Sequence, residues 1–163
     1  MGKSSLINRL LGVRGLARIS SRPGRTQSVN FYRVNEAFHF VDLPGYGHAS
    51  VPGRVREAWA PMVEGFLERS RGRVTLAILL VDARHGTTPL DRIMRDWLES
   101  NGVRYVVAAT KSDKLSGNSR TETRRALERE LAGSKLAEGA VLTSARTGLG
   151  IREIWRHLDS ALG

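Results

Sequence analysis

The stretch VTLAILLVD, residues 74–82, decides the fold, because it is a near-continuous apolar run that ends in a carboxylate. Two shorter runs, VRYVVAA at 103–109 and AVLT at 140–143, have the same character. Such runs are typical of parallel strands that helices bury on both faces. They predict an α/β fold with a mixed, mostly parallel sheet.

Helical patterns flank and separate these runs, at about 4–11, 53–70, 89–100, 119–132 and 150–161. Ser119 and Glu122 have the spacing of a capping box for one of these helices, and Gly133 is its expected stop. Strands that alternate with helices predict helices on both faces of the sheet.

Two further strands are predicted upstream, VNFYRV at 29–34 and AFHFVD at 37–42, joined by a tight turn at Asn35-Glu36. In α/β sheets, ligands bind in the loops beyond the carboxyl ends of the strands. Several polar motifs of the chain follow strands and fall in such loops.

The length and composition predict one globular domain, residues 1–163. Cysteine is absent from the sequence, which excludes a disulfide scaffold, a thiolate metal site and a cysteine nucleophile. The sequence has no apolar run of transmembrane length and no signal-peptide pattern at its start. The expected compartment is therefore the cytoplasm, with no membrane partner.

The charge balance is strongly basic. Lys and Arg number 26 against 16 Asp and Glu, which gives a formal net charge of +10. Such an excess favours a polyanionic partner, most often a nucleic acid. Most of these cations are arginines, and a GC-rich genome alone also produces that skew.

Gly2-Lys3-Ser4 opens a helical pattern and matches the second half of a P-loop, G-x-x-x-x-G-K-[ST]. In a P-loop the backbone amides and the helix N-terminus cradle phosphates, the Lys reaches the β- and γ-phosphates, and the hydroxyl binds Mg²⁺. Three residues are a weak motif by themselves, and an ordinary helix start or a tag remnant explains them equally well.

Asp42-Leu43-Pro44-Gly45 follows the strand predicted at 37–42. A carboxylate there can hold a water of a Mg²⁺ ion, and a glycine amide can approach a γ-phosphate because no Cβ intervenes. The alternative is a loop whose Asp caps a helix.

Thr110-Lys111-Ser112-Asp113 follows the strand at 103–109, and Ser144-Ala145 follows the strand at 140–143. The Asp113 carboxylate can accept two N–H bonds from the edge of guanine, which adenine does not offer. The Ala145 amide can donate to guanine O6. The alternative for both segments is an ordinary polar turn.

These motifs occur together in the order and spacing of a GTPase, with Thr26 in a Gly/Arg-rich loop between the first two. The chain resembles the EngB (YihA/YsxC) family of bacterial ribosome-assembly GTPases, of the TRAFAC class and Era-like superfamily, over almost its whole length. The segments that carry the resemblance are GKSSLINRLLG at 2–12, SSRPGRTQSVNFYRV at 20–34, FVDLPGYGHASVP at 40–52, TKSDKLS at 110–116 and TSARTGLGI at 143–151.

The resemblance implies a Ras-like P-loop GTPase fold, GTP or GDP as the ligand, and Mg²⁺ as the cofactor. It implies nucleotide contacts from Gly2, Lys3, Ser4, Gly24, Arg25, Thr26, Gln27, Ser28, Asp42, Leu43, Pro44, Gly45, Thr110, Lys111, Ser112, Asp113, Thr143, Ser144 and Ala145. It also implies that Ser4, Thr26 and, through a water, Asp42 hold the metal, and that Lys3, Thr26 and Gly45 support the transition state.

No catalytic side chain is evident in the chain itself, because Tyr46 stands where Ras-type GTPases have a water-orienting Gln. Slow hydrolysis is therefore expected, accelerated by a partner or by a bound monovalent cation such as K⁺. The family's partner is the large ribosomal subunit with its rRNA, and the family is linked to normal septation. A monomer is expected. The arginines expected to contact rRNA, with solvated surface positions as the alternative, are Arg22, Arg25, Arg54, Arg56, Arg69, Arg71 and Arg73.

The sequence departs from the family at its start, where Met1 stands at the usual Val and the preceding strand and first half of the P-loop are missing. A misassigned gene start or a true truncation explains this. The missing strand would be central, so a gap is expected between the strands at 37–42 and 74–82, with low stability as its result. The alternatives to a GTPase of this family are an RNA- or ribosome-binding remnant without nucleotide binding, and an Era- or Der-like GTPase.

Overall fold

A computed structural model of the chain describes residues 2–13, 15, 29–45, 53–70 and 72–163, with the backbone alone for 53–60. The chain divides into two compact units. The first unit comprises residues 1–17 and 74–163, and the second comprises residues 18–73.

The first unit contains a three-stranded parallel sheet in the order β3 (Ala77–Asp82), β4 (Tyr105–Thr110) and β5 (Ala137–Leu142). Every residue of the central strand β4 is buried. The three apolar runs of the sequence are thus parallel strands, as predicted. The first begins later than expected, at Ala77, and the last begins earlier, at Ala137.

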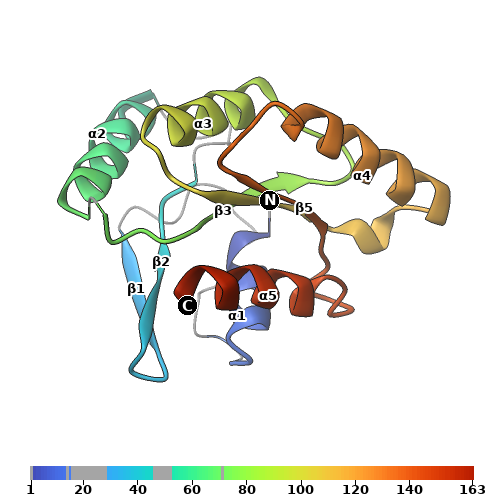
Figure 1. The fold of residues 1–163 in the computed structure, drawn as a ribbon, viewed down its shortest axis with the longest axis horizontal. Helices are drawn as coiled ribbons and strands as arrows, with labels where there is room; N and C mark the ends of the chain where they lie inside the picture. Colours follow the sequence, from blue (N-terminus) through green and yellow to red (C-terminus); the bar gives the residue numbers. More distant parts are fainter. Residues whose placement is uncertain (1, 14, 16–28, 46–52, 71) are drawn as a thin grey trace. The chain divides into compact units, whose positions relative to one another are not determined.

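Helices cover both faces of this sheet, as Figure 1 shows for α3 (Pro89–Ser100) and α4 (Gly117–Leu131) on one face and α1 (Lys3–Leu10) and α5 (Ile151–Leu162) on the other. Each helix buries one apolar stripe, as an amphipathic surface helix does. The buried residues on these stripes include Leu6, Ile7, Leu10, Leu98, Leu127, Leu131, Ile154 and Leu158. The indole Nε1 of Trp155 in α5 also donates to the carbonyl oxygen of Leu10, at 3.2 Å.

The second unit contains an antiparallel hairpin of β1 (Asn30–Val34) and β2 (Phe38–Asp42), and the helix α2 (Gly53–Arg69). Asn35 and Glu36 form the turn with positive φ values of 47° and 59°, which confirms the predicted turn position. The rings of Phe31 in β1 and Phe66 in α2 meet edge to face, with centroids 5.9 Å apart.

The start of α4 differs from the prediction. The helix begins at Gly117, two residues early, because Ser116 is extended (φ −65°, ψ 166°) and its side chain accepts from the Ser119 amide at 3.3 Å. Ser116 is therefore the N-cap, and the predicted capping box of Ser119 and Glu122 is wrong. The helix ends next to Gly133, with Ala132 as the C-cap.

The hairpin strands and the parallel strands belong to separate sheets, so β2 and β3 are not paired in the described part of the chain. Direct pairing would have contradicted the gap expected between them, and the gap itself stays a prediction. Among the described helices, none has the length and apolar character that a membrane span requires.

Candidate nucleotide site

The motifs of the first unit gather at the carboxyl ends of its three strands. Asp82 ends β3, Thr110 ends β4 and Thr143 follows β5. Asp82 is the register partner of Thr110, and Ala109 is the partner of Leu142, so the three strand ends lie level with one another. This is the edge at which α/β sheets bind ligands.

Buried hydroxyls fix the loops that leave this edge. The Thr110 hydroxyl donates to the carbonyl of Val81 at 3.0 Å, and the Ser112 hydroxyl donates to the carbonyl of Ala109 at 2.8 Å. The Thr143 amide donates to the same Ala109 carbonyl at 2.7 Å. Thr110, Ser112 and Thr143 therefore shape the loops from inside the protein, since each is at most 4% exposed.

Asp113 lies in the short 3₁₀ helix η1 (Ser112–Lys114), with its carboxylate held from the β5 side. The Ser144 hydroxyl donates to Oδ1 at 2.7 Å, and Arg146 Nε donates to Oδ2 at 2.9 Å. These bonds, the one from Ser144 first, hold the pKa of Asp113 below its ordinary value. Asp113 thus presents an ionised, oriented carboxylate, which can accept a pair of N–H donors.

The loop after β5 is tightly closed around Ser144. The Ser144 amide donates to the Leu149 carbonyl at 3.0 Å, and the Gly148 amide donates back to the Ser144 carbonyl at 2.9 Å. Gly150 then passes so close to the strand that a Cβ there would lie 2.2 Å from the Leu142 carbonyl oxygen. Ala145, the next residue after buried Ser144, is half-buried in this loop.

Lys111 connects the loop after β4 to the start of α1. Its backbone is left-handed (φ 60°), and its Nζ donates to Asp82 Oδ2 at 2.8 Å. A Cβ placed on Gly2 would lie 3.9 Å from Lys111 Cε. Gly2 is the N-cap of α1, and Lys3 and Ser4 are its first two residues. The P-loop-like motif Gly2-Lys3-Ser4 and the loop Thr110-Lys111-Ser112-Asp113 thus lie next to each other in this unit.

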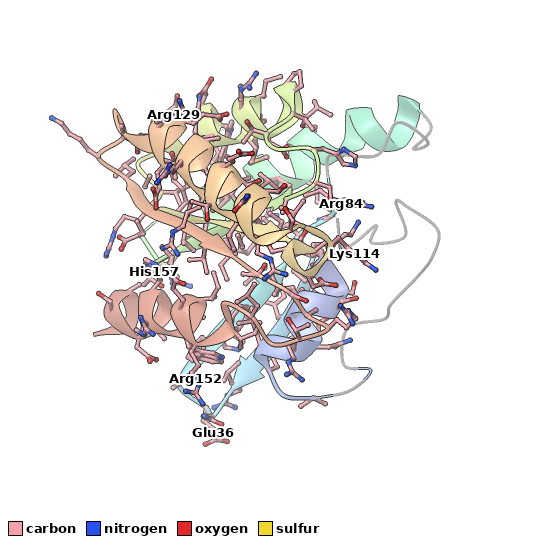
Figure 2. The ribbon with its side chains drawn as sticks, turned by 90° about the vertical axis from the view of Figure 1, so that its right-hand side faces the viewer. Glu36, Arg84, Lys114, Arg129, Arg152 and His157 are labelled. Atoms are coloured by element: carbon pink, nitrogen blue, oxygen red, sulfur yellow. The ribbon has the colours of Figure 1, made fainter. Side chains whose placement is uncertain are left out.

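Asp82 is a residue of this edge that the sequence motifs did not indicate. It accepts hydrogen bonds from Arg84 and Lys111. These bonds, the one from Arg84 first, hold the pKa of the Asp82 carboxyl far below its ordinary range. A signal was present in the sequence, because Asp82 closes the apolar run at 74–82 as the other motifs close theirs. Figure 2 labels Arg84 and Lys114, which follow β3 and β4 at this edge.

Asp42 ends β2 in the second unit, where it is 4% exposed. It is the register partner of Asn30. The pKa of nearby Tyr32 is raised, first by burial of its hydroxyl and second by the charge of Asp42. Pro44 is buried, while Leu43 and Gly45 are half-buried.

Several expected site residues lie outside the part of the chain that the structure describes. Gly24, Arg25, Thr26, Gln27, Ser28 and Tyr46 fall outside the described residues, as do Arg22 and Arg71. Arg69 and Arg73 are described and exposed, and Arg54 and Arg56 are described by their backbone alone. Among the expected metal ligands, the described ones are the Ser4 hydroxyl and the Asp42 carboxylate, and oxygen donors of these types fit Mg²⁺.

Two family profiles match the chain. The family described as 50S ribosome-binding GTPase matches residues 1–111. The elongation factor Tu GTP-binding domain family matches residues 65–162.

Relatives with substantial identity are named EngB. A probable GTP-binding protein EngB of Pelotomaculum thermopropionicum is 46% identical over 163 residues, which cover all of this chain and 81% of the relative. The corresponding protein of Halothermothrix orenii is 42% identical over 158 residues, covering 97% of this chain and 79% of the relative.

Solved structures share the fold. A crystal structure of a probable GTP-binding protein EngB superposes with a TM-score of 0.74 at 24% identity, covering 99% of this chain and 92% of that one. Era in complex with MgGDPNP and a segment of 16S ribosomal RNA gives 0.76 at 20% identity, covering 98% and 52%. At these identities the structures show the fold alone. The family profile and the sequence relatives show that the chain belongs to the EngB family of GTP-binding proteins and is a GTPase.

Proposed function

We propose that this chain is a guanine-nucleotide switch that acts in assembly of the large ribosomal subunit. The observation that carries the nucleotide part is the Asp113 carboxylate, ionised and oriented by Ser144 at the ends of β4 and β5. An acceptor pair of this kind matches the N1–H and N2 amine of guanine, and adenine leaves it unpaired.

The remaining residues take roles that their chemistry supports. Lys3 and the first amides of α1 bind the phosphates, since a helix N-terminus favours anions. Lys111 lines the site beside Gly2. Thr143, Ser144 and Ala145 form the loop beside the base, in which Thr143 and Ser144 act from within and the Ala145 amide donates to guanine O6. Gly24 to Ser28 and Asp42 to Gly45 sense the γ-phosphate.

Mg²⁺ is proposed as the cofactor, held by Ser4, Thr26 and, through a water, Asp42. When bound, it would neutralise charge on the β- and γ-phosphates. Because Tyr46 follows Gly45 in place of a carboxamide, the chain offers no evident side chain to orient the attacking water. Intrinsic hydrolysis is therefore slow, and a ribosomal partner or a monovalent cation such as K⁺ accelerates it.

The ribosomal part of the proposal is supported by the net charge of +10 and by the family description, 50S ribosome-binding GTPase. Era, a structural neighbour, is solved with 16S ribosomal RNA. The exposed Arg69 and Arg73 belong to the arginines proposed to contact rRNA. The chain would act as a cytoplasmic monomer, and its link to septation would follow from ribosome supply.

The decisive experiment is calorimetric titration of the chain with GTP, GDP and ATP, with and without Mg²⁺. Micromolar, magnesium-dependent GTP binding with much weaker ATP binding is expected. Equal affinity for GTP and ATP would contradict the role of Asp113. If no nucleotide binds, the chain is instead a ribosome-binding remnant without a switch.

Ribosome binding is tested by co-sedimentation with 50S subunits at increasing KCl concentration. If arginines neutralise Z phosphates of rRNA, log K falls linearly with log salt, with a slope of about −0.7Z to −0.9Z. Binding that does not change with salt would show that the basic surface is not the contact.

A further inference from the structure

Asp82 accepts hydrogen bonds from Arg84 and Lys111 at the carboxyl edge of the parallel sheet, and the function proposed above does not use it. Its Oδ1 accepts from Arg84 Nε at 2.9 Å and from the Arg84 amide at 3.2 Å. Its Oδ2 accepts from Arg84 Nη2 and from Lys111 Nζ, each at 2.8 Å. Only 14% of its side chain is exposed.

The backbone around Asp82 is as well fixed as its side chain. The His85 and Gly86 amides donate to the Asp82 carbonyl at 3.0 and 3.1 Å, which turns the chain back immediately after β3. The Arg84 guanidinium meets the carboxylate in a two-pronged geometry, the arrangement that fixes orientation as well as charge. Asp82 is therefore a rigid, ionised acceptor.

The Lys111 side chain joins this acceptor to the nucleotide motifs. Lys111 lies two residues before Asp113, and its Cε lies 3.9 Å from the position that a Cβ on Gly2 would occupy. Its ammonium reaches Asp82, so the aliphatic stem is held beside the start of α1. Lysine is flexible along four carbons, and a fixed partner for its ammonium removes that freedom.

We propose that Asp82 is a positioning residue of the nucleotide site, which holds the Lys111 stem against Gly2 and thereby slows the departure of bound guanine nucleotide. The inference rests on the proposed function, because it assigns Lys111 and Gly2 to that site. Asp82 does not contact the base, so the preference for guanine stays with Asp113.

The test compares dissociation of GDP carrying a fluorescent N-methylanthraniloyl group from the full chain and its variants, after a chase with unlabelled GDP. Asp82→Asn removes the charge and frees the Lys111 ammonium. Since the Asp82–Lys111 pair is partly exposed, dissociation should be about 3- to 10-fold faster, with the GDP-to-ADP preference unchanged.

Glu138→Gln is the matched control. Glu138 also accepts from an arginine, Arg104 Nε at 2.7 Å, with 21% of its side chain exposed, but it lies near the amino end of β5. This variant should leave GDP dissociation unchanged. An equal acceleration in Glu138→Gln and Asp82→Asn would reveal general loosening of the fold and overturn the proposal.

A double-mutant cycle with Lys111→Gln separates positioning from a merely structural role. If Asp82 acts through Lys111, the double variant releases GDP no faster than Lys111→Gln alone. Additive effects in the two single variants would overturn the proposal. Asp82→Glu keeps the charge and should recover part of the slow dissociation.

Two outcomes remain distinct from these. If Asp82→Asn does not fold, Arg84→Ala tests the same idea. The Arg84 side chain is exposed, and its removal takes away the two-pronged hydrogen bonding that orients Asp82. Unchanged GDP dissociation in that variant would overturn the role of Asp82. If the unaltered chain binds no guanine nucleotide, the proposed function fails and this inference falls with it. Normal binding with unchanged release in Asp82→Asn contradicts the role of Asp82 alone.

Discussion

The two ends of the parallel sheet carry comparable polar networks with different consequences. Near the amino ends of β4 and β5, the Tyr105 hydroxyl donates to Glu99 at 2.7 Å, and Ser134 bonds to the same carboxylate. Ser134 also accepts from the Leu136 and Ala137 amides at 3.1 and 2.8 Å. At the carboxyl ends, Asp82 is bonded by Arg84 of its own loop and by Lys111 of the next, and Asp113 is bonded by Ser144 and Arg146 of the loop after β5.

The two networks therefore differ in which segments of the chain they join and in which of their members are exposed. At the amino ends Ser134 joins the Glu99 carboxylate to two backbone amides of its own loop, so the described network is local to that end of the sheet. At the carboxyl ends the carboxylates are ionised and are oriented by exposed arginines and by Ser144. We expect changes to the polar groups at the amino ends to lower stability alone, and changes to the carboxylates at the carboxyl ends to alter nucleotide binding.

The largest effect on stability is expected at Gly150, where the loop after β5 leaves no room for a side chain. Gly150→Ala would place a Cβ 2.2 Å from the Leu142 carbonyl oxygen, at a residue with φ of 72°. The free energy of unfolding should fall by about 2–4 kcal/mol, and Tm by roughly 5–10 °C. Differential scanning calorimetry measures both. Gly117→Ala, where a Cβ meets nothing within 4 Å, should leave Tm nearly unchanged.

The next effect concerns recognition alone. Asp113→Asn replaces one acceptor by a donor, so GTP affinity should fall roughly 10- to 100-fold and xanthine nucleotides should be preferred. Titration calorimetry with GTP and XTP checks the result. Asp96→Asn is the control, because Asp96 is an exposed carboxylate bonded to Arg95 at 3.0 Å on α3.

The pH dependence of GTP affinity sharpens this prediction. The hydrogen bond from Ser144 foremost lowers the folded-state pKa of Asp113. The carboxylate is therefore ionised at every pH above the ordinary aspartate pKa, near 4, and its negative charge is lost only as the pH falls below that pKa. The contribution of Asp113, measured as the ratio of GTP affinities of the unaltered chain and Asp113→Asn, should therefore be equal at pH 7 and pH 5.5, although the γ-phosphate of GTP itself titrates in this range. A loss of affinity that follows protonation of Asp113 within that range would contradict the bonding described.

A smaller effect is expected at the amino end. Tyr105→Phe removes a buried hydroxyl that donates to Glu99, and the free energy of unfolding should fall by about 1–2 kcal/mol. Burial raises the pKa of Tyr105 to about 12, so the hydroxyl remains a donor in all ordinary buffers. Urea unfolding measures the loss, and GDP affinity should not change. Weakened GDP binding would break the distinction between the two ends.

The smallest effect tests the cap of the helix that follows the Asp113 loop. Ser116→Ala should cost about 1 kcal/mol of stability, because the Ser119 amide loses its acceptor. Ser119→Ala removes no cap and should cost less. Parallel urea titrations compare the two, and a larger loss in Ser119→Ala would restore the capping box predicted from sequence.

The sequence predicted the strands well because buried parallel strands are continuous apolar runs. It missed the start of β5, where Glu138 and Gly139 interrupt the apolar pattern, and the start of α4, where Gly117 is a poor helix former. The motifs that begin at Asp42, Thr110 and Thr143 lie at strand ends as predicted, since that follows from the fold class. Partnerships such as Lys111 with Asp82 join segments 29 residues apart, and local pattern carries no signal for them.

The register between β4 and β5 has a consequence for the loop that follows β5. It shifts by one residue between Tyr105 and Val106, where Gly139 has φ of 132°, so Ala109 faces Leu142 rather than Val141. If β5 paired with β4 without this irregularity, Val141 would face Ala109, and every later residue of β5 would lie about 3.3 Å further along with its side chain on the opposite face. Thr143 would then reach the place of Ser144 beside Asp113. The irregularity at the far end of the strand thus aligns the hydroxyl that holds the Asp113 carboxylate.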